Sequence, residues 1–255
     1  MNMYQEERME AVLKYLEKNK KMSIQDMCEH FGVSRDTARR DTVKLTEKEA
    51  VVRTHGGVML PGLITSLKGY TERLEKSAEE KMKIANTAAK QIIQEEVIML
   101  DASTTVQFTS ELVNVSPLTV ITNSIVNAET ITEKRNIDIH LPGGRLNVVH
   151  RFLYGSSTVE KIHQFYADKA FIGVIGICND GLYYAHEEDA AVKKAMAERS
   201  ETVYVLADST KFGKRHFIKG LDLEDVDCII TDKQPGEELA AVFQENGIKL
   251  LIADS

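Results

Sequence analysis

Hydrophobic and polar residues follow two different patterns along this chain, one before residue 60 and another after residue 76. In the first part, Met9, Val12, Leu13 and Leu16 recur at the spacing of a helix with one buried face. In the second part, short apolar runs alternate with helical stretches. We therefore predict two domains, at residues 1–60 and 77–255, with a linker at residues 61–76 that begins in a stretch rich in Pro, Gly and Ser.

Capping and turn residues divide the first domain into helices. Ser23 followed by Asp26 predicts a capping box at the start of a second helix, and Gly32 predicts its end, because glycine tolerates positive φ. Ser34 predicts the N-cap of a third helix, whose expected inward face is Ala38, Thr42 and Leu45. Residues 51–60 predict a β-hairpin with glycines at or near its turn. Two helices, a tight turn and a hairpin are typical of a winged helix-turn-helix that binds DNA.

Basic side chains gather on the third predicted helix. Arginine can hold a guanine edge through two hydrogen bonds or pair with a phosphate, so this helix suits DNA recognition. The candidate DNA-binding residues are Ser34, Arg35, Thr37, Arg39, Arg40, Lys44, Arg53 and His55. The alternative is a solvated helix face on which Asp36 pairs with Arg40. The preceding capped helix, the glycine turn and the hairpin favour DNA binding.

The second domain alternates strands with helices. One predicted helix carries Ile84, Ala85, Ala88, Ile92 and Ile93 on one side. Predicted strands lie at residues 97–100, 118–122, 137–141, 169–174, 202–207, 228–231 and 249–252. Several are near-continuous apolar runs, which is typical of parallel strands covered on both faces. The predicted fold class is α/β, with an N-terminal winged helix-turn-helix followed by a three-layer α/β domain.

Polar residues follow several of these strands. Ligands of open α/β sheets bind at the carboxyl ends of strands, and hydroxyls with backbone N–H groups at a helix start suit an anion. The candidate effector-binding residues are Asp101, Ser103, Thr104, Thr105, Thr122, Asn123, Gly143, Gly144, Arg145, Lys193, Asp208 and Lys211. The alternatives stay open, because Asp, Ser and Thr are also the best helix caps. Lys193, on a helix predicted over residues 188–199, is expected to be a solvated side chain more than a functional one.

Charge and cysteine content narrow the class of protein. The net charge of −7 is uneven: residues 1–60 hold 11 basic and 10 acidic residues, and the rest hold 21 and 29. An acidic second domain disfavours nonspecific adhesion to DNA. The three cysteines are widely spaced, which predicts neither disulfides nor a metal site, and we expect no cofactor. The sequence shows no signal-peptide pattern and no apolar run of about 18 residues, so we expect a cytoplasmic protein with no membrane contact.

The first domain resembles the N-terminal domain of the DeoR family of bacterial transcription regulators. The matching residues are Phe31, Gly32, Val33, Ser34, Thr37, Arg39, Arg40, Asp41, Leu45, Arg53, Thr54, His55, Gly56 and Gly57. Ala38 and Thr42 stand where the family usually has isoleucine and leucine, and the pair Glu49 and Ala50 stands near its usual glycine. The smaller or polar residues at positions 38 and 42 predict a less tightly packed third helix.

The second domain resembles the sensor domain of the same family. The matching residues are Asp101, Ser103, Thr104, Thr105, Thr122, Asn123, Ser124, Gly143, Gly144, Phe152, Gly155, Asp168, Gly173, Lys193, Asp208, Lys211 and Gly213. The resemblance implies a fold related to ribose-phosphate isomerases and a phosphorylated sugar or related metabolite as effector. Ser103 replaces a usual glycine, and Tyr183 and Tyr184 replace smaller residues, which predicts a narrower pocket.

The leading hypothesis is a repressor of a sugar-catabolism operon that binds double-stranded operator DNA and is released by a phosphorylated sugar. A homo-oligomer, dimer or tetramer, would place two recognition helices in neighbouring major grooves. One alternative is a sugar-phosphate isomerase-like enzyme or a transferase. The carboxylates Glu187, Glu188 and Asp189 fall at a helix start, where capping explains them, so we expect no enzyme. Another alternative is a metabolite-binding module whose first domain binds protein.

Overall fold

The structure is a computed structural model that describes residues 5–19, 21–48, 50–54, 57–59 and 70–253. Contacts between residues group the chain into two units, Met1–Lys68 and Gly69–Ser255. The second unit begins with a short helix, α5 (Tyr70–Glu75), whose Tyr70 is buried. This helix lies inside the range 61–76, where the apolar pattern indicated no helix.

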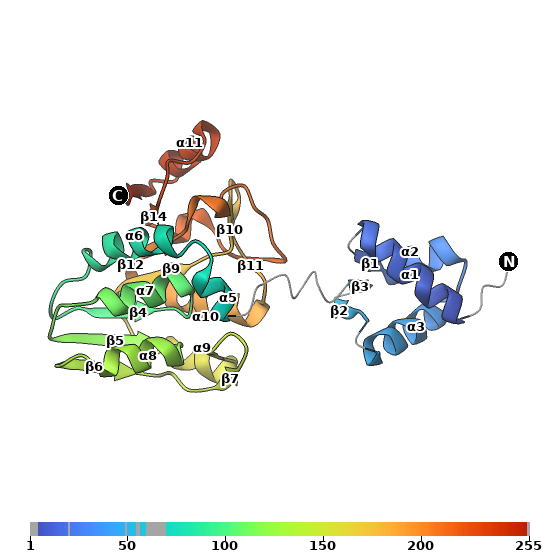
Figure 1. Ribbon diagram of the computed structural model, residues 1–255, viewed down its shortest axis with the longest axis horizontal. Coiled ribbons are helices and arrows are strands. Elements are labelled where there is room, and N and C mark those ends of the chain that lie inside the picture. The colour runs from blue at the N-terminus through green and yellow to red at the C-terminus, as the bar shows by residue number, and fades with distance from the viewer. Residues whose placement is uncertain (1–4, 20, 49, 55–56, 60–69, 254–255) are drawn as a thin grey trace. The chain divides into compact units, whose positions relative to one another are not determined.

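Among its described residues, the first unit has three helices and a small antiparallel sheet with strand order β1-β3-β2 (Figure 1). Its elements are α1 (Gln5–Asn19), β1 (Lys21–Ser23), α2 (Ile24–Phe31), α3 (Arg35–Glu47), β2 (Val52–Thr54) and β3 (Gly57–Met59). The capping box of Ser23 and Asp26 is present, and Gly32 ends α2 with φ of 62°. The inward residues of α1, α2 and α3 meet in one core that includes Val12, Met27 and Leu45. The predicted winged helix-turn-helix is confirmed, and β1 adds a strand that the pattern did not predict.

The second unit is built on a seven-stranded parallel sheet with strand order β15-β14-β12-β9-β4-β5-β6. The strands are β4 (Val97–Leu100), β5 (Leu118–Thr122), β6 (Ile137–His140), β9 (Ala167–Gly173), β12 (Ser200–Leu206), β14 (Cys228–Thr231) and β15 (Lys249–Ile252). All seven correspond to the predicted strands, with small shifts at their ends. Their apolar runs are explained by burial on both faces of the sheet.

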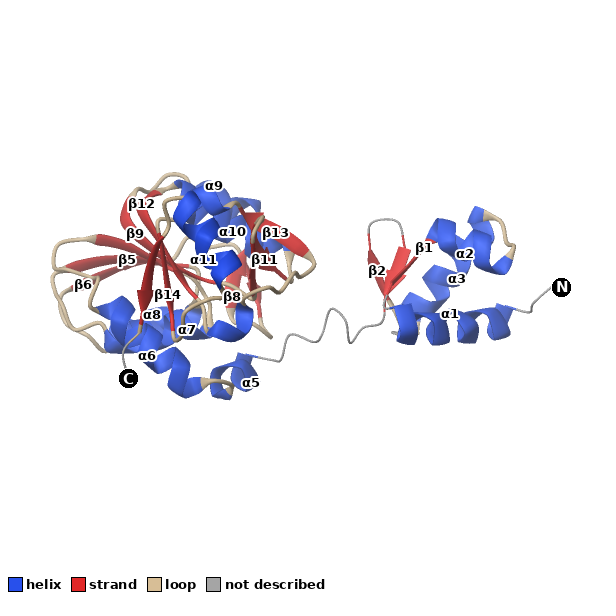
Figure 2. Cartoon of the chain, turned by 90° about the horizontal axis from the view of Figure 1, so that it is seen from above, coloured by secondary structure: helices blue, strands red, loops and turns tan. Residues whose placement is uncertain are grey.

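Helices cover both faces of this sheet, which confirms the three-layer prediction (Figure 2). One layer is α6 (Ala78–Ala89), α7 (Thr104–Leu112) and α8 (Ile125–Thr132), and the other is α9 (Ser156–Ile162), α10 (Glu187–Glu198) and α11 (Glu237–Glu245). Successive residues of β4 alternate between the two cores: Ile98 and Leu100 face the first, and Met99 faces the second. The expectation that Ile93 faces inward is wrong, because α6 ends at Ala89 and Ile93 is 59% exposed.

Five short strands among the described residues of the second unit were not predicted from the sequence. A hairpin joins β7 (Arg145–Asn147) to β8 (Phe152–Tyr154), and a second antiparallel sheet contains β10 (Gly176–Cys178), β11 (Gly181–Tyr184) and β13 (Ile218–Leu221). The close approach of β13 to β11 depends on Gly220, since a side chain there would collide with the ring of Tyr184. Within the described ranges, no helix has the length and apolar character needed to cross a membrane.

Candidate DNA-reading helix and effector site

Helix α3 separates its basic residues from its apolar ones. Arg35, Arg39, Arg40 and Lys44 are exposed. On the opposite side Ala38, Thr42 and Leu45 are buried, as predicted. Ser34 caps the helix, and its Oγ accepts a hydrogen bond of 3.2 Å from the backbone N–H of Thr37. Arg35, Arg39 and Arg40 on this exposed face can therefore reach an external partner.

A buried carboxylate on α3, which the sequence analysis did not single out as a site residue, fixes the helix against α1. Asp41 is fully buried, and its Oδ2 lies 2.6 Å from Nε of Arg8. Its other oxygen accepts a hydrogen bond of 2.7 Å from Gln5, whose side-chain oxygen in turn accepts one of 2.7 Å from Lys44. Several directional contacts thus set the rotation of α3 and hence the direction of its basic face. The triplet Arg39-Arg40-Asp41 was visible in the sequence, but only packing shows which member points inward.

The structure tests some of the other expectations for the first unit and leaves others as predictions. Thr42 is accommodated in the core, since its hydroxyl donates a 2.8 Å hydrogen bond to the carbonyl of Ala38. Asp36 and Arg40 form no ion pair in the part of the chain that the structure describes. Arg53 lies on β2, but its side chain is outside the described part, as is the whole of His55. Their contact with DNA stays a prediction.

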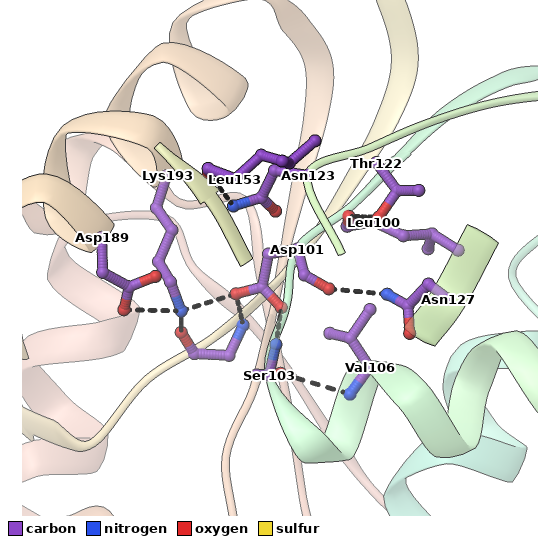
Figure 3. Close-up of polar contacts among 11 residues, drawn as sticks. Leu100, Asp101, Ser103, Val106, Thr122, Asn123, Asn127, Leu153, Asp189 and Lys193 are labelled. Atoms are coloured by element: carbon purple, nitrogen blue, oxygen red, sulfur yellow. Dashed lines mark hydrogen bonds and ion pairs between the residues drawn. The ribbon is translucent and has the colours of Figure 1, made fainter. Parts of the chain in front are cut away.

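The second site is centred on Asp101, directly after β4 (Figure 3). Its side chain is fully buried, and Oδ1 accepts a 2.8 Å hydrogen bond from the N–H of Ser103. Oδ2 accepts one of 2.8 Å from the N–H of Gly173, at the end of β9, and lies 2.6 Å from Nζ of Lys193. Asn127 donates a 2.7 Å hydrogen bond to the Asp101 carbonyl. The carboxylate therefore ties together the ends of two neighbouring strands and helix α10.

Lys193 is not solvated, so that expectation is wrong. It is 4% exposed, because α10 packs over the strand ends, and Nζ donates a 2.8 Å hydrogen bond to the carbonyl of Gly173. Nζ also lies 3.5 Å from Asp189 and 5.0 Å from the centre of the Tyr184 ring. Burial alone would lower the pKa of Lys193, but Asp101 and Asp189 outweigh burial and raise it. The lysine is thus held as a cation between two carboxylates.

The end of β5 lies beside the end of β4. Leu100 pairs with Thr122 in the parallel register, so Asp101 and Asn123 leave adjacent strands at the same edge. Asn123 donates a 3.2 Å hydrogen bond from Nδ2 to the carbonyl of Leu153. Its Oδ1 is buried and has no hydrogen-bond partner among the described residues. An oriented acceptor without a donor is rare in protein interiors and suggests an external donor.

Hydroxyls at these strand ends also act as caps, so the capping alternative holds for part of the motif. Ser103 Oγ accepts a 3.2 Å hydrogen bond from the N–H of Val106 at the start of α7. Thr122 Oγ1 accepts a 3.1 Å hydrogen bond from the N–H of Ser124, the N-cap residue of α8, and donates one of 2.6 Å to the carbonyl of Leu100. Thr104 and Thr105 are buried in the first turn of α7. Capping does not exclude ligand binding, because the same turn exposes backbone N–H groups.

Two further predicted groups lie on other segments. The side chain of Asp208 is 2% exposed, and its Oδ2 lies 3.2 Å from Nζ of Lys211. Burial alone would raise the pKa of Asp208, but the charge of Lys211 and the hydrogen bonds from Thr210 outweigh burial and lower it. Gly143 accepts a 2.7 Å hydrogen bond from Thr158 at its carbonyl. Arg145 is exposed, with its guanidinium 5.4 Å from the Tyr154 ring. Within the described ranges, no hydrogen bond or ion pair joins Gly143, Gly144 or Arg145 to the Asp101 group.

Helix α5 brings in a set of charged residues that the sequence analysis missed. Arg73 Nη2 lies 3.4 Å from Nδ1 of His150, and the His150 ring lies 5.2 Å from that of His186. Burial lowers the pKa of His150 to about 4, with further lowering by Arg73 and His186. Lys81 donates a hydrogen bond to the Arg73 carbonyl, and burial, with the charge of Lys211, lowers its pKa to about 8. Only the tertiary contacts indicate these residues, because α5 is short and sits in an apparent linker.

Comparison with known protein families covers both units. The DeoR-like helix-turn-helix domain matches residues 8–62, and the DeoR C terminal sensor domain matches residues 76–233. Full-length relatives include the HTH-type transcriptional repressor GlcR of Bacillus subtilis, 43% identical over 99% of this chain and 98% of the relative. The glycerol-3-phosphate regulon repressor of Escherichia coli is 30% identical over 97% of this chain and 99% of the relative.

Solved structures resemble the chain at low sequence identity. A D-ribose-5-phosphate isomerase in complex with phospho-erythronic acid has 20% identity and a TM-score of 0.40, covering 53% of this chain and 54% of that chain. The eIF2B beta subunit of Chaetomium thermophilum has 15% identity and a TM-score of 0.47, covering 66% and 54%. The family assignment therefore rests on the two matched domains and on the full-length relatives. The chain belongs to the DeoR family and is a DNA-binding transcriptional regulator, not an enzyme.

Proposed function

We propose that this chain represses a sugar-catabolism operon and leaves its operator when a phosphorylated sugar binds the second unit. The names of the relatives support this, since two of them are repressors, GlcR and the glycerol-3-phosphate regulon repressor. A third relative, from Haemophilus influenzae, is named an L-fucose operon activator, so repression is part of the proposal. We further propose that the protein acts in the cytoplasm as a symmetric homo-oligomer.

The observation that carries the effector proposal is the polar cluster at the carboxyl edge of the parallel sheet. Asp101, Asn123 and Gly173 end three neighbouring strands, and Lys193 is drawn onto them from α10. The start of α7 lies at the same edge, where backbone N–H groups favour an anion. Ligands of open α/β sheets occupy this edge. We therefore assign sugar-phosphate binding to this cluster, with Asp208 and Lys211 at the end of the adjacent strand β12.

For DNA, we assign recognition to the exposed face of α3. Arg35, Arg39 and Arg40 would contact base edges and phosphates in the major groove, with Thr37 near the leading end of the helix. If each domain neutralises roughly three to five phosphates, the log–log salt dependence of a dimer should have a slope of about −5 to −9. Coupling of about 1–3 kcal/mol per effector site would suffice to release the protein.

Fluorescence anisotropy on the duplex upstream of the protein's own coding region tests the proposal. We expect tight, salt-sensitive binding that one compound from a panel of sugar phosphates relieves, while a scrambled duplex of the same length binds only weakly. The unphosphorylated sugars serve as matched controls and should have no effect. Tight binding that no sugar phosphate changes would refute the effector assignment, and binding no stronger than to the scrambled duplex would refute the operator assignment.

A further inference from the structure

The predicted lysines of the effector site are already neutralised within the chain. Lys193 Nζ lies 2.6 Å from Asp101 and 3.5 Å from Asp189. Lys211 lies 3.2 Å from Asp208. A phosphate monoester carries nearly two negative charges near neutral pH, so it needs positive charge that no carboxylate has taken. The motif residues therefore leave open which cation would hold the phosphate.

Arg73 has the charge that the motif lysines lack. No carboxylate lies within ion-pair distance of it in the described part of the chain, although Asp189 and Asp101 act on it from farther away. Its side chain is only partly exposed, and Nε is buried without a hydrogen-bond partner among the described residues. The contact of 3.4 Å with His150 is long and occupies a different nitrogen. A guanidinium that is largely buried without a counter-ion is unfavourable, and an anion bound to it would remove this cost.

Other cationic groups lie near Arg73. Lys81 is 5% exposed and donates to the Arg73 carbonyl. The guanidinium of Arg151 lies 5.2 Å from the centre of the Tyr70 ring, on which Arg73 also stacks at 5.8 Å. His186 Nε2 is buried without a hydrogen-bond partner among the described residues. Three cations and an unused ring nitrogen thus gather around one helix, α5.

We propose that Arg73 binds the phosphoryl group of the effector, with Lys81 and Arg151 supplying the second positive charge and His186 a further hydrogen bond. The planar guanidinium can hold two phosphoryl oxygens at once, which a lysine cannot. This subsite deepens the proposed function and rests on it, because it places one end of the sugar phosphate. The polyol end then lies toward Asn123, whose buried Oδ1 has no donor among the described residues.

The position of Arg73 in the sequence gives the subsite a regulatory consequence. Helix α5 is the first described element after residue 59, so it is the part of the second unit closest in sequence to the DNA-binding unit. Its Tyr70 hydroxyl donates a hydrogen bond to Gln107 on α7, the helix that starts at the effector motif. An anion on Arg73 would therefore bind the described element of the second unit that lies nearest in sequence to the DNA-binding unit.

The test uses the full-length protein, inorganic phosphate as the probe, and the variants Arg73→Met, Arg73→Lys and Arg135→Met. Arg135 is an exposed arginine in the turn after α8, so its variant makes the same chemical change away from the site. In titration calorimetry we expect Arg73→Met to weaken phosphate binding roughly 10- to 100-fold, Arg73→Lys to weaken it less, and Arg135→Met to bind as the wild type does. Without phosphate, Arg73→Met should unfold at no lower a temperature than the wild type, because it removes a buried unpaired charge.

Phosphate binding by Arg73→Met as tight as by the wild type would overturn the subsite, and so would the absence of phosphate binding by the wild type. If unchanged phosphate binding comes with a lower unfolding temperature of Arg73→Met, Arg73 is a structural residue. Release of the protein from operator DNA distinguishes a failure of the subsite from a failure of the proposed function. If the sugar phosphate that releases the wild type from operator DNA also releases Arg73→Met normally, the subsite is refuted and the proposed function stands. If Arg73 binds phosphate but no sugar phosphate releases the protein from operator DNA, the proposed effector is refuted and the subsite stands.

Discussion

Replacing Asp101 with asparagine removes the negative charge at the centre of the effector cluster while keeping the size of the side chain. The carboxylate is fully buried and lies 2.6 Å from Lys193, whose side chain is 5% exposed. It also accepts hydrogen bonds from the N–H groups of Ser103 and Gly173, and an amide cannot accept from all three donors. Breaking a buried ion pair by removing one partner costs roughly 3–5 kcal/mol. Because Asp189 remains 3.5 Å from Lys193, we expect a loss near the lower limit, about 3 kcal/mol.

Urea unfolding of the full-length protein, followed by far-ultraviolet circular dichroism, measures this loss in the transition of the second unit. The matched control is Asp138→Asn, since the side chain of Asp138 is 74% exposed and its partner His140 is also exposed. We expect the control to change the free energy of unfolding by less than about 0.5 kcal/mol. The double variant Asp101→Asn with Lys193→Met should recover part of the loss, because it also removes the buried ammonium that Asp101→Asn leaves with only the 3.5 Å contact to Asp189.

The reasoning fails if Asp101→Asn is no more destabilising than Asp138→Asn. It also fails if the losses of Asp101→Asn and Lys193→Met simply add in the double variant, because additivity would mean that the two side chains do not interact. Either result would show that the ion pair contributes little to the stability of the sensor fold.

Three further predictions concern DNA binding, pH and packing. The variant Arg39→Ala with Arg40→Ala should lose specific operator binding in anisotropy but keep the unfolding transition of the second unit; unchanged operator affinity would refute the role of α3. Because the pKa of His150 falls from 6.5 to about 4 on folding, the unfolded state takes up the proton first as pH falls, so about 3 kcal/mol of stability should be lost between pH 6.5 and 4. In urea titrations at several pH values, the free energy of unfolding should fall less steeply with decreasing pH for His150→Gln than for the wild type. An equal pH dependence of the two proteins would contradict this. A side chain at Gly173 would collide with Ser103, so Gly173→Ala should cost roughly 1–3 kcal/mol, and adding Ser103→Gly should restore it; a loss that persists in the double variant would point to another cause.

Much of the fold was predictable because its signals are local. The parallel strands are runs such as Val97–Leu100, buried on both faces, and apolar runs of that kind stand out in the sequence. The short strands β7, β10 and β11 were missed because three or four residues do not establish a period. The hairpin turn between β7 and β8 is misleading as well, since Val148 is 78% exposed.

The site was predictable only as far as it follows strand ends. Asp101 and Asn123 could be placed together because carboxyl ends of parallel strands share an edge. Lys193 was misjudged because it follows acidic residues on its helix, and only the packing of α10 shows that it is buried. Arg73 gave no signal, because its importance depends on distant residues such as His150. Asp41 likewise needed its contact with Arg8, far away in the sequence.

The strand order also determines when each part of the chain can fold during synthesis. The first unit has its own core, assembled from residues close together in sequence, so it can fold as soon as it leaves the ribosome. The sheet cannot be completed so early, because β9 lies between β4 and β12, and β12 ends only at Leu206. A nascent chain therefore displays a finished DNA-binding unit before its sensor exists. We expect premature termination or proteolysis between the units to release fragments that occupy operator DNA without responding to any metabolite.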